Sequence, residues 1–185
     1  MNTRISTKKL VLTGLLAALT CVASAIRITV PLNIAGTTAF HLGNIFCALS
    51  GILLGPWLGG AAAGIGSVLY DLTNPAYISE CWITFLTKFA YAMAAGLVIR
   101  WGQKDWGYFR ALLATTAGAL TYALLYLCKS YFYSGLLVHG LEPGAALATV
   151  VGKLPATAFN AVVAMVIAPV LALAVNKALQ RQHLL

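Results

Sequence analysis

The chain has 185 residues, of which 61% are hydrophobic and 9% charged, and its mean hydropathy is +0.87. Soluble domains carry roughly 25% charged residues, so this composition excludes an ordinary water-soluble protein and favours one embedded in lipid. The net charge of +8 does not indicate nucleic-acid binding, because the basic residues are spread between apolar segments rather than gathered on one face.

Long apolar runs separated by short polar stretches predict the fold. At about 20 residues per crossing, the chain has room for about six membrane spans. The uninterrupted runs do not fit the alternating pattern of a membrane β-barrel. We therefore predict an all-α membrane protein, a compact bundle of six transmembrane helices that forms a single domain over residues 1–185. The spans are expected at about 10–30, 40–55, 58–72, 82–99, 110–127 and 145–176.

Basic residues flank these spans in a pattern that predicts orientation. They lie before the first span, between the fourth and fifth, and after the sixth, namely Arg4, Lys8, Lys9, Arg100, Lys104, Arg110, Lys177 and Arg181. Cytoplasmic loops are enriched in Lys and Arg. Both termini and the 100–110 connection are therefore predicted to face the cytoplasm.

The opposite, outer side collects most of the remaining polar residues. Its ionisable members are Arg27, His41, Asp71, Glu80, Lys88, Lys129, His139, Glu142 and Lys153. Tyrosine and tryptophan accompany them, a combination that suits a solute pocket with flat walls and a few orienting polar groups. Each such residue could instead be an ordinary interfacial aromatic or a snorkelling cation. The predicted substrate-binding residues are His41, Asn44, Tyr70, Asp71, Asn74, Lys88, Tyr126, Tyr133, Lys153 and Asn160.

Catalytic chemistry has no support in the sequence. It contains no Ser-His-Asp grouping, no phosphate-binding glycine loop and no nucleotide-binding pattern, so no catalytic residue and no cofactor is predicted. His41 and His139 are too isolated from thiolates and carboxylates to predict a metal site. We do not expect an enzyme.

Three stretches carry a family resemblance. Phe40-His41-Leu42-Gly43-Asn44, Gly51-Ile52-Leu53-Leu54-Gly55-Pro56 and the segment from Gly64 through Tyr70-Asp71-Leu72 resemble the substrate-binding S components of energy-coupling factor (ECF) vitamin transporters. The resemblance extends over nearly the whole chain. It implies a six-helix membrane subunit that captures a vitamin outside and works with a transmembrane T component and two cytoplasmic ATPase subunits.

A stripe of small residues in the first span adds to this resemblance. Gly14-Leu15-Leu16-Ala17-Ala18 is similar to the small-residue motif of helix one in S components, which packs against the T component. The family motif is usually written with alanines, so Gly14 departs from it but remains small. Small residues spaced by four allow close helix contact within lipid. Gly14 and Ala18 are therefore expected to dock the partner, with packing inside the chain's own bundle as the alternative.

The identity of the substrate has several candidates. The HLGN stretch and the YDLTNPAY stretch most resemble the cobalamin-specific S components of lactic-acid bacteria, which favours cobalamin. Pyridoxine or riboflavin are the alternatives within the family. Outside it, a stand-alone carrier coupled to an ion gradient would use an intramembrane acid such as Asp71, and a membrane scaffold would bind no solute.

Overall fold

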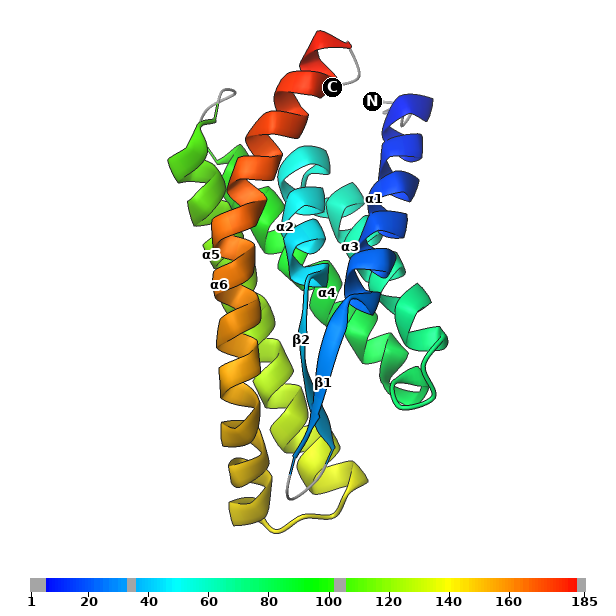
Figure 1. Ribbon diagram of the computed structural model, residues 1–185, viewed down its shortest axis with the longest axis vertical. Coiled ribbons are helices and arrows are strands. Elements are labelled where there is room, and N and C mark those ends of the chain that lie inside the picture. The colour runs from blue at the N-terminus through cyan, green and yellow to red at the C-terminus, as the bar shows by residue number, and fades with distance from the viewer. Residues whose placement is uncertain (1–5, 33–35, 102–105, 183–185) are drawn as a thin grey trace.

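A computed structural model describes residues 6–32, 36–101 and 106–182 (Figure 1). The predicted basic positions Arg4 and Lys104 lie outside this part of the chain. Six α-helices, a two-stranded sheet and two short helical segments follow one another. They are α1 (Thr7–Ala25), β1 (Arg27–Pro31), β2 (Thr37–His41), α2 (Gly43–Leu54), α3 (Pro56–Leu72), η1 (Ile78–Glu80), α4 (Cys81–Arg100), α5 (Tyr108–Lys129), η2 (Ser130–Val138) and α6 (Pro143–Arg181).

Four helical stretches of the described chain are long and apolar enough to cross a membrane. They are Thr7–Ala25, Ile78–Arg100, Tyr108–Val138 and Pro143–Arg181. This confirms a helical, multi-pass membrane protein. Helix α2 has 12 residues, a length of about 18 Å against the ~30 Å of a hydrocarbon core. The count of six complete spans therefore remains a prediction.

A β-hairpin replaces the outer ends of the first two predicted spans and the loop expected between them. Helix α1 ends at Ala25 rather than near Val30, and α2 begins at Gly43 rather than Phe40. Between them β1 and β2 pair antiparallel, with Arg27 opposite His41 and Pro31 opposite Thr37. The hairpin residues include Ile28, Thr29 and Val30, whose branched side chains favour strands. The purely α-helical description was therefore wrong for this segment.

The segment after α5 also differs from its prediction. The stretch from Lys129 to Pro143 was expected to be a loop, but α5 continues as the π-helical segment η2 up to Val138. The following helix, α6, has 39 residues and stays helical through Pro155 and Pro169. Its length is about 58 Å, well beyond the ~30 Å hydrocarbon core. Helix α6 is thus long enough to line both halves of the molecule.

Helix α2 lies at the centre of the bundle. Eleven of its twelve residues are buried. Its neighbours come close where glycine removes the side chain: an added Cβ at Gly51 would collide with the backbone of Ala92, and one at Gly59 with the backbone of Ser50. The turn between α2 and α3 uses Gly55 at φ +82°, a conformation that glycine adopts without strain. Arg100 closes this turn by donating from Nη2 to the Leu54 carbonyl at 2.9 Å.

The two ends of the molecule hold different parts of the chain. The start of α1, the end of α4, the start of α5 and the end of α6 lie at one end (Figure 1). The hairpin, η2 and the start of α6 lie at the other, which we call the hairpin end. This arrangement agrees with an even number of chain crossings. Which end faces the cytoplasm stays a prediction.

Candidate substrate-binding site

A cavity of about 340 Å³ lies in the hairpin half of the bundle. Its walls come from the hairpin, from α3 and the α3–α4 connection, and from α4, α5, η2 and α6. This volume falls at the small end of the range of roughly 300–1,000 Å³ for ligand pockets. The polar and aromatic side chains in its lining include Arg27, Thr37, Thr38, His41, Tyr70, Asp71, Tyr77, Glu80, Thr84, Thr87, Lys88, Tyr122, Tyr126, Lys129, Ser134, His139, Lys153, Thr157 and Asn160.

Seven of the ten predicted substrate-binding residues line this cavity: His41, Tyr70, Asp71, Lys88, Tyr126, Lys153 and Asn160. Asn44 is buried directly behind the lining, where its Oδ1 accepts a hydrogen bond from Lys88 Nζ at 2.5 Å. Asn74 and Tyr133 lie outside the lining. Asn74 forms a turn after α3 by accepting from the Ala76 N–H at 3.0 Å, and Tyr133 packs edge-on against Trp82. The fold thus brings predicted residues from four separate helices and the hairpin into one cavity.

Tyr122 and Tyr126 form one wall of the cavity, and the buried Tyr91 stacks behind them. The rings of Tyr91 and Tyr122 stack with centroids 5.9 Å apart, and those of Tyr122 and Tyr126 with centroids 5.6 Å apart. Lys88 Nζ lies 3.9 Å from the centre of the Tyr122 ring. Aromatic faces attract cations and also offer a flat surface to planar ligands. The tyrosine wall therefore suits a substrate with an aromatic ring.

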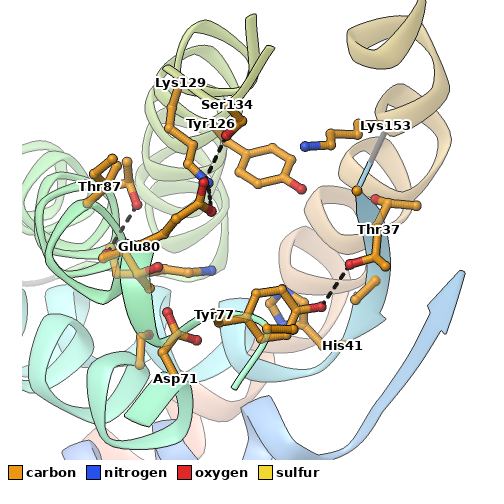
Figure 2. Close-up of a pocket in the computed structure, with 18 of the residues that line it drawn as sticks. Thr37, His41, Asp71, Tyr77, Glu80, Thr87, Tyr126, Lys129, Ser134 and Lys153 are labelled. Atoms are coloured by element: carbon orange, nitrogen blue, oxygen red, sulfur yellow. Dashed lines mark hydrogen bonds and ion pairs between the residues drawn. The ribbon is translucent and has the colours of Figure 1, made fainter. Parts of the chain in front are cut away.

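A polar cluster beside this wall ties η1, which leads into α4, to the end of α5 and to η2. Glu80 forms an ion pair with Lys129, and its Oε1 accepts a hydrogen bond from Ser134 Oγ at 3.0 Å. Figure 2 shows these three side chains together at the rim of the cavity, with Tyr126 and Lys153 beside them. Since Glu80 already pairs with Lys129, it compensates one of the lining charges. The cluster thus links the start of α4 to the end of α5 at the edge of the polar cavity.

Asn160 fastens the hairpin to α6. Its Oδ1 accepts from the His41 backbone N–H at 2.9 Å, and its Nδ2 donates to the Ala39 carbonyl at 2.8 Å. One side-chain amide thus satisfies two backbone groups of β2, as a neighbouring strand would. Phe40 adds an edge-to-face contact with Phe159, with centroids 5.1 Å apart.

Two contacts join the hairpin to the other side of the cavity. The hydroxyls of Thr37 and Tyr77 lie 3.2 Å apart (Figure 2). At the base of β1, the Arg27 guanidinium lies 4.0 Å from the centre of the Tyr70 ring and 5.0 Å from that of Tyr77. The hairpin therefore covers the cavity and is held by α6 on one side and by the α3–α4 region on the other.

His41 sits at the junction of hairpin and α2. Its Nδ1 accepts a hydrogen bond from the Gly43 N–H at 3.2 Å, so this nitrogen is unprotonated. Burial, with smaller contributions from Lys88 and Arg27, holds the pKa of His41 well below its ordinary range. A neutral imidazole therefore caps the first turn of α2. Among the described residues, no group of three His, Cys, Asp or Glu side chains is placed to hold a metal ion.

Several lining residues were not among the predicted substrate-binding residues. Arg27, Glu80, Lys129 and His139 belonged to the predicted outer polar set but were not selected, and Tyr122, Thr38 and Ser134 carried no signal of their own. The sorting of ionisable residues by membrane side would have found the first four. Lone hydroxyls give no such signal, because serine and threonine in membrane helices commonly bond their own backbone.

The two predicted docking residues lie away from the cavity. Gly14 and Ala18 are exposed on the outward side of α1. An added Cβ at Gly14 would meet no atom of the described residues within 4 Å. Neighbouring side chains on this helix, including Leu15 at 55% and Val22 at 61% exposure, also point outward. The alternative that Gly14 packs inside the chain's own bundle is therefore not supported by the geometry.

Comparisons with known proteins give a consistent result. A family model described as "ECF-type riboflavin transporter, S component" matches residues 4–177, nearly the whole chain. A Pyrococcus woesei protein, described as an uncharacterized protein in the gap 3′ region, is 31% identical over 132 residues. That match covers 71% of this chain and 78% of the archaeal protein.

Proposed function

This chain belongs to the S components of ECF-type transporters, and from that premise we propose that its cavity captures a small heteroaromatic vitamin of the flavin type. Members of this family are membrane-embedded, substrate-binding subunits of vitamin importers, not enzymes. They associate with a T component and ATPase components. The absence of a nucleotide-binding pattern in the sequence fits this division of labour.

The cavity is the observation that carries the proposal. It is covered by the hairpin, lined on one wall by Tyr122 and Tyr126, and bordered by polar groups from α3, α4 and α6. Ligand pockets combine such flat apolar walls with a few orienting polar groups. We propose the seven lining residues from the sequence prediction as substrate contacts, with Arg27, Tyr77, Tyr122 and Ser134 added to them. Asn44 acts from behind through Lys88.

Riboflavin is the first candidate among the vitamins. The matching family is described as a riboflavin transporter, and a cavity of about 340 Å³ suits a ring system of moderate size. Cobalamin, which the sequence likeness favoured, is the second candidate. A corrinoid is several times larger, so it would require the hairpin to move away from Tyr77 and open the cavity. Pyridoxine would fill only part of the space.

Partner docking is assigned to the outward face of α1. Gly14 and Ala18 leave a shallow strip between exposed Leu15 and Val22, which a partner helix could approach closely. The strip lies toward the end that holds Lys8, Lys9, Arg100 and Arg110, which the positive-inside rule assigns to the cytoplasm. The cavity lies in the opposite half. Substrate would thus enter from outside while the partner subunits act from the cytoplasmic side.

Purification followed by mass spectrometry tests the capture step. The protein should be isolated from cells grown in rich medium, its bound small molecules identified, and the isolated protein titrated with riboflavin, cobalamin, pyridoxine and folate. We expect binding by this chain alone. A folded protein that binds none of these and carries no small molecule would contradict the proposal.

Reconstituted uptake tests the division of labour. Vesicles that contain this chain with a T component and the ATPases should accumulate substrate only when ATP is supplied. Vesicles that contain this chain alone should not. Uptake by the chain alone under an ion gradient would instead support an ion-coupled carrier that uses Asp71.

A further inference from the structure

The lining of the cavity is not electrically balanced. Four cationic side chains, Arg27, Lys88, Lys129 and Lys153, face two carboxylates, Asp71 and Glu80. Apart from its two histidines, the lining therefore carries two positive charges in excess. Ionisable groups at membrane depth are costly unless a partner, water or a ligand compensates them. The excess charge favours a ligand with an acidic group.

Lys88 has partners within the protein. Its ammonium donates to Asn44 Oδ1 at 2.5 Å and lies over the Tyr122 ring at 3.9 Å. Asp71 is close enough to interact with it electrostatically. Lys129 is paired with Glu80, the one ion pair within 4.0 Å that the described residues form. Neither lysine needs a ligand to balance it.

Lys153 is less well compensated than either: Glu80 interacts with it electrostatically, but this carboxylate is already paired with Lys129. It is 6% exposed, and its ammonium donates a single protein hydrogen bond among the described residues, to Ser130 Oγ at 3.1 Å. The nearest ring, that of Tyr126, has its centre 5.5 Å away. An ammonium has three N–H donors, so two remain for a ligand. Figure 2 shows the Lys153 side chain reaching into the cavity toward Tyr126.

We propose that the substrate carries a carboxylate or phosphate that binds at Lys153, while its heteroaromatic ring packs against the adjoining tyrosine wall of Tyr126 and Tyr122. This inference rests on the proposed function and narrows it: free riboflavin carries no acidic group, so the substrate would be a flavin phosphate or another acidic heteroaromatic vitamin. Charge-assisted hydrogen bonds from an ammonium to such groups are among the stronger polar contacts in proteins. Lys153 would then bind the acidic group, and the two tyrosines would pack against the ring.

Matched pairs of neutral and acidic ligands test this assignment. Nicotinamide with nicotinate probes a carboxylate, and riboflavin with riboflavin 5′-phosphate probes a phosphate. Binding of each is measured by calorimetry with the purified wild-type chain and with Lys153→Met, Lys153→Arg and Lys177→Met. Lys177 is exposed at the far end of the same helix and controls for the loss of one lysine.

In at least one pair, we expect the wild type to bind the acidic member roughly tenfold or more tightly than the neutral one. Lys153→Met should remove that preference while leaving the neutral ligand within about twofold, Lys153→Arg should keep most of it, and Lys177→Met should change nothing. An equal loss for both members in Lys153→Met, a preference for the neutral member, or no binding in any pair would overturn the inference. A protein that binds and imports a neutral vitamin would leave the proposed function standing and remove only this assignment.

Discussion

The two halves of this protein are held together by different kinds of contact. In the half with the chain termini, helices approach through glycine, with Gly51 against Ala92, Gly59 against Ser50 and Gly96 against Pro56. In the hairpin half, strands continue from the ends of α1 and α2, and the space between the hairpin and the remaining helices is polar. The first half is held by contact between backbones. The second depends on individual ties, chiefly Asn160 and the Glu80–Lys129 pair.

This difference fits the two tasks proposed for the chain, which are binding a solute and docking to a partner subunit. Backbone contacts make a body with little internal space, whose outer surface can present a face of small residues such as Gly14 and Ala18. Polar ties at the other end can be exchanged for contacts with a ligand. Substitutions in the first half should therefore affect folding or coupling, and those in the second should affect binding.

The largest expected effect comes from overpacking the half with the termini. Gly51→Leu would place a side chain into the backbone of Ala92 in α4, which cannot move without displacing the centre of the bundle. We expect a loss at or above the upper end of about 1–3 kcal/mol, and little folded protein. Size-exclusion profiles and thermal unfolding in detergent measure this. Gly144→Leu, where an added Cβ meets no described atom within 4 Å, is the matched control, and equal behaviour of both variants would contradict the proposed packing.

A bulky residue on the outward face of α1 should separate coupling from capture. Gly14→Trp has space in the isolated chain, so the protein should fold and bind substrate within about twofold of wild type. One large side chain prevents the close helix approach that small residues allow, so ATP-driven uptake with the partner subunits should be lost. Uptake in reconstituted vesicles and titration of the isolated chain measure the two effects.

Two other outcomes would revise the docking assignment. If Gly14→Trp weakens substrate binding as strongly as uptake, the face matters for the fold of this chain itself. If neither quantity changes, the face meets only lipid. Val166→Trp, at an exposed position on α6, is a suitable control for adding a large side chain to the surface.

The sequence predicted the helical half of the molecule better than the hairpin half. Six helical segments follow from apolar run length, because backbone groups in lipid must be paired within the segment. The hairpin was missed because Ile26 through Val30 continues the apolar run of α1, and run length does not distinguish a helix from a strand there. What decides it is distant: Asn160 holds β2 from 119 residues further along the chain.

Distant contacts, which the sequence pattern does not reveal, also determine the roles of residues in the site. Sorting charged residues by membrane side placed Lys88, Asp71 and Lys153 on one side, and the structure brings them to one cavity. The sequence could not distinguish the roles of Lys129 and Lys153. Both look like cations near helix ends, yet one is paired with Glu80 and the other bonds only a serine among the described residues. That distinction arises from η2, which the sequence did not predict as a helical segment.

Loss of the hairpin tie should have a moderate effect. Asn160→Ala removes one hydrogen bond from the His41 N–H and one from the Ala39 carbonyl, both of them part-buried between β2 and α6. We expect a destabilisation of about 1–3 kcal/mol and faster amide hydrogen exchange in β2. Asn160→Asp keeps the acceptor for the His41 N–H but places a carboxylate oxygen against the Ala39 carbonyl, so it should not restore the tie. Weaker substrate binding is also expected, because Asn160 is among the proposed substrate contacts, but unchanged exchange in β2 would contradict its role in holding the hairpin.

The smallest expected effect is a pH dependence centred on His41. The pKa of His41 is held well below its ordinary range, chiefly by burial, while in the unfolded chain it lies near about 6.5. Above that pH both states hold a neutral imidazole, and His41 contributes no slope. As the pH falls below it, the unfolded chain binds a proton that the folded protein excludes, so stability falls by at most about 1.4 kcal/mol per pH unit.

Protonation of His41 would also break the bond from the Gly43 N–H and place a positive charge at the start of α2. Thermal unfolding between pH 7.5 and 5.5 should therefore show a decline that His41→Gln reduces, with His139→Gln, an exposed histidine at the rim, as the control for losing an imidazole. If His41→Gln keeps the full decline, the acid sensitivity arises from other groups and His41 is not the neutral cap that its hydrogen bond indicates.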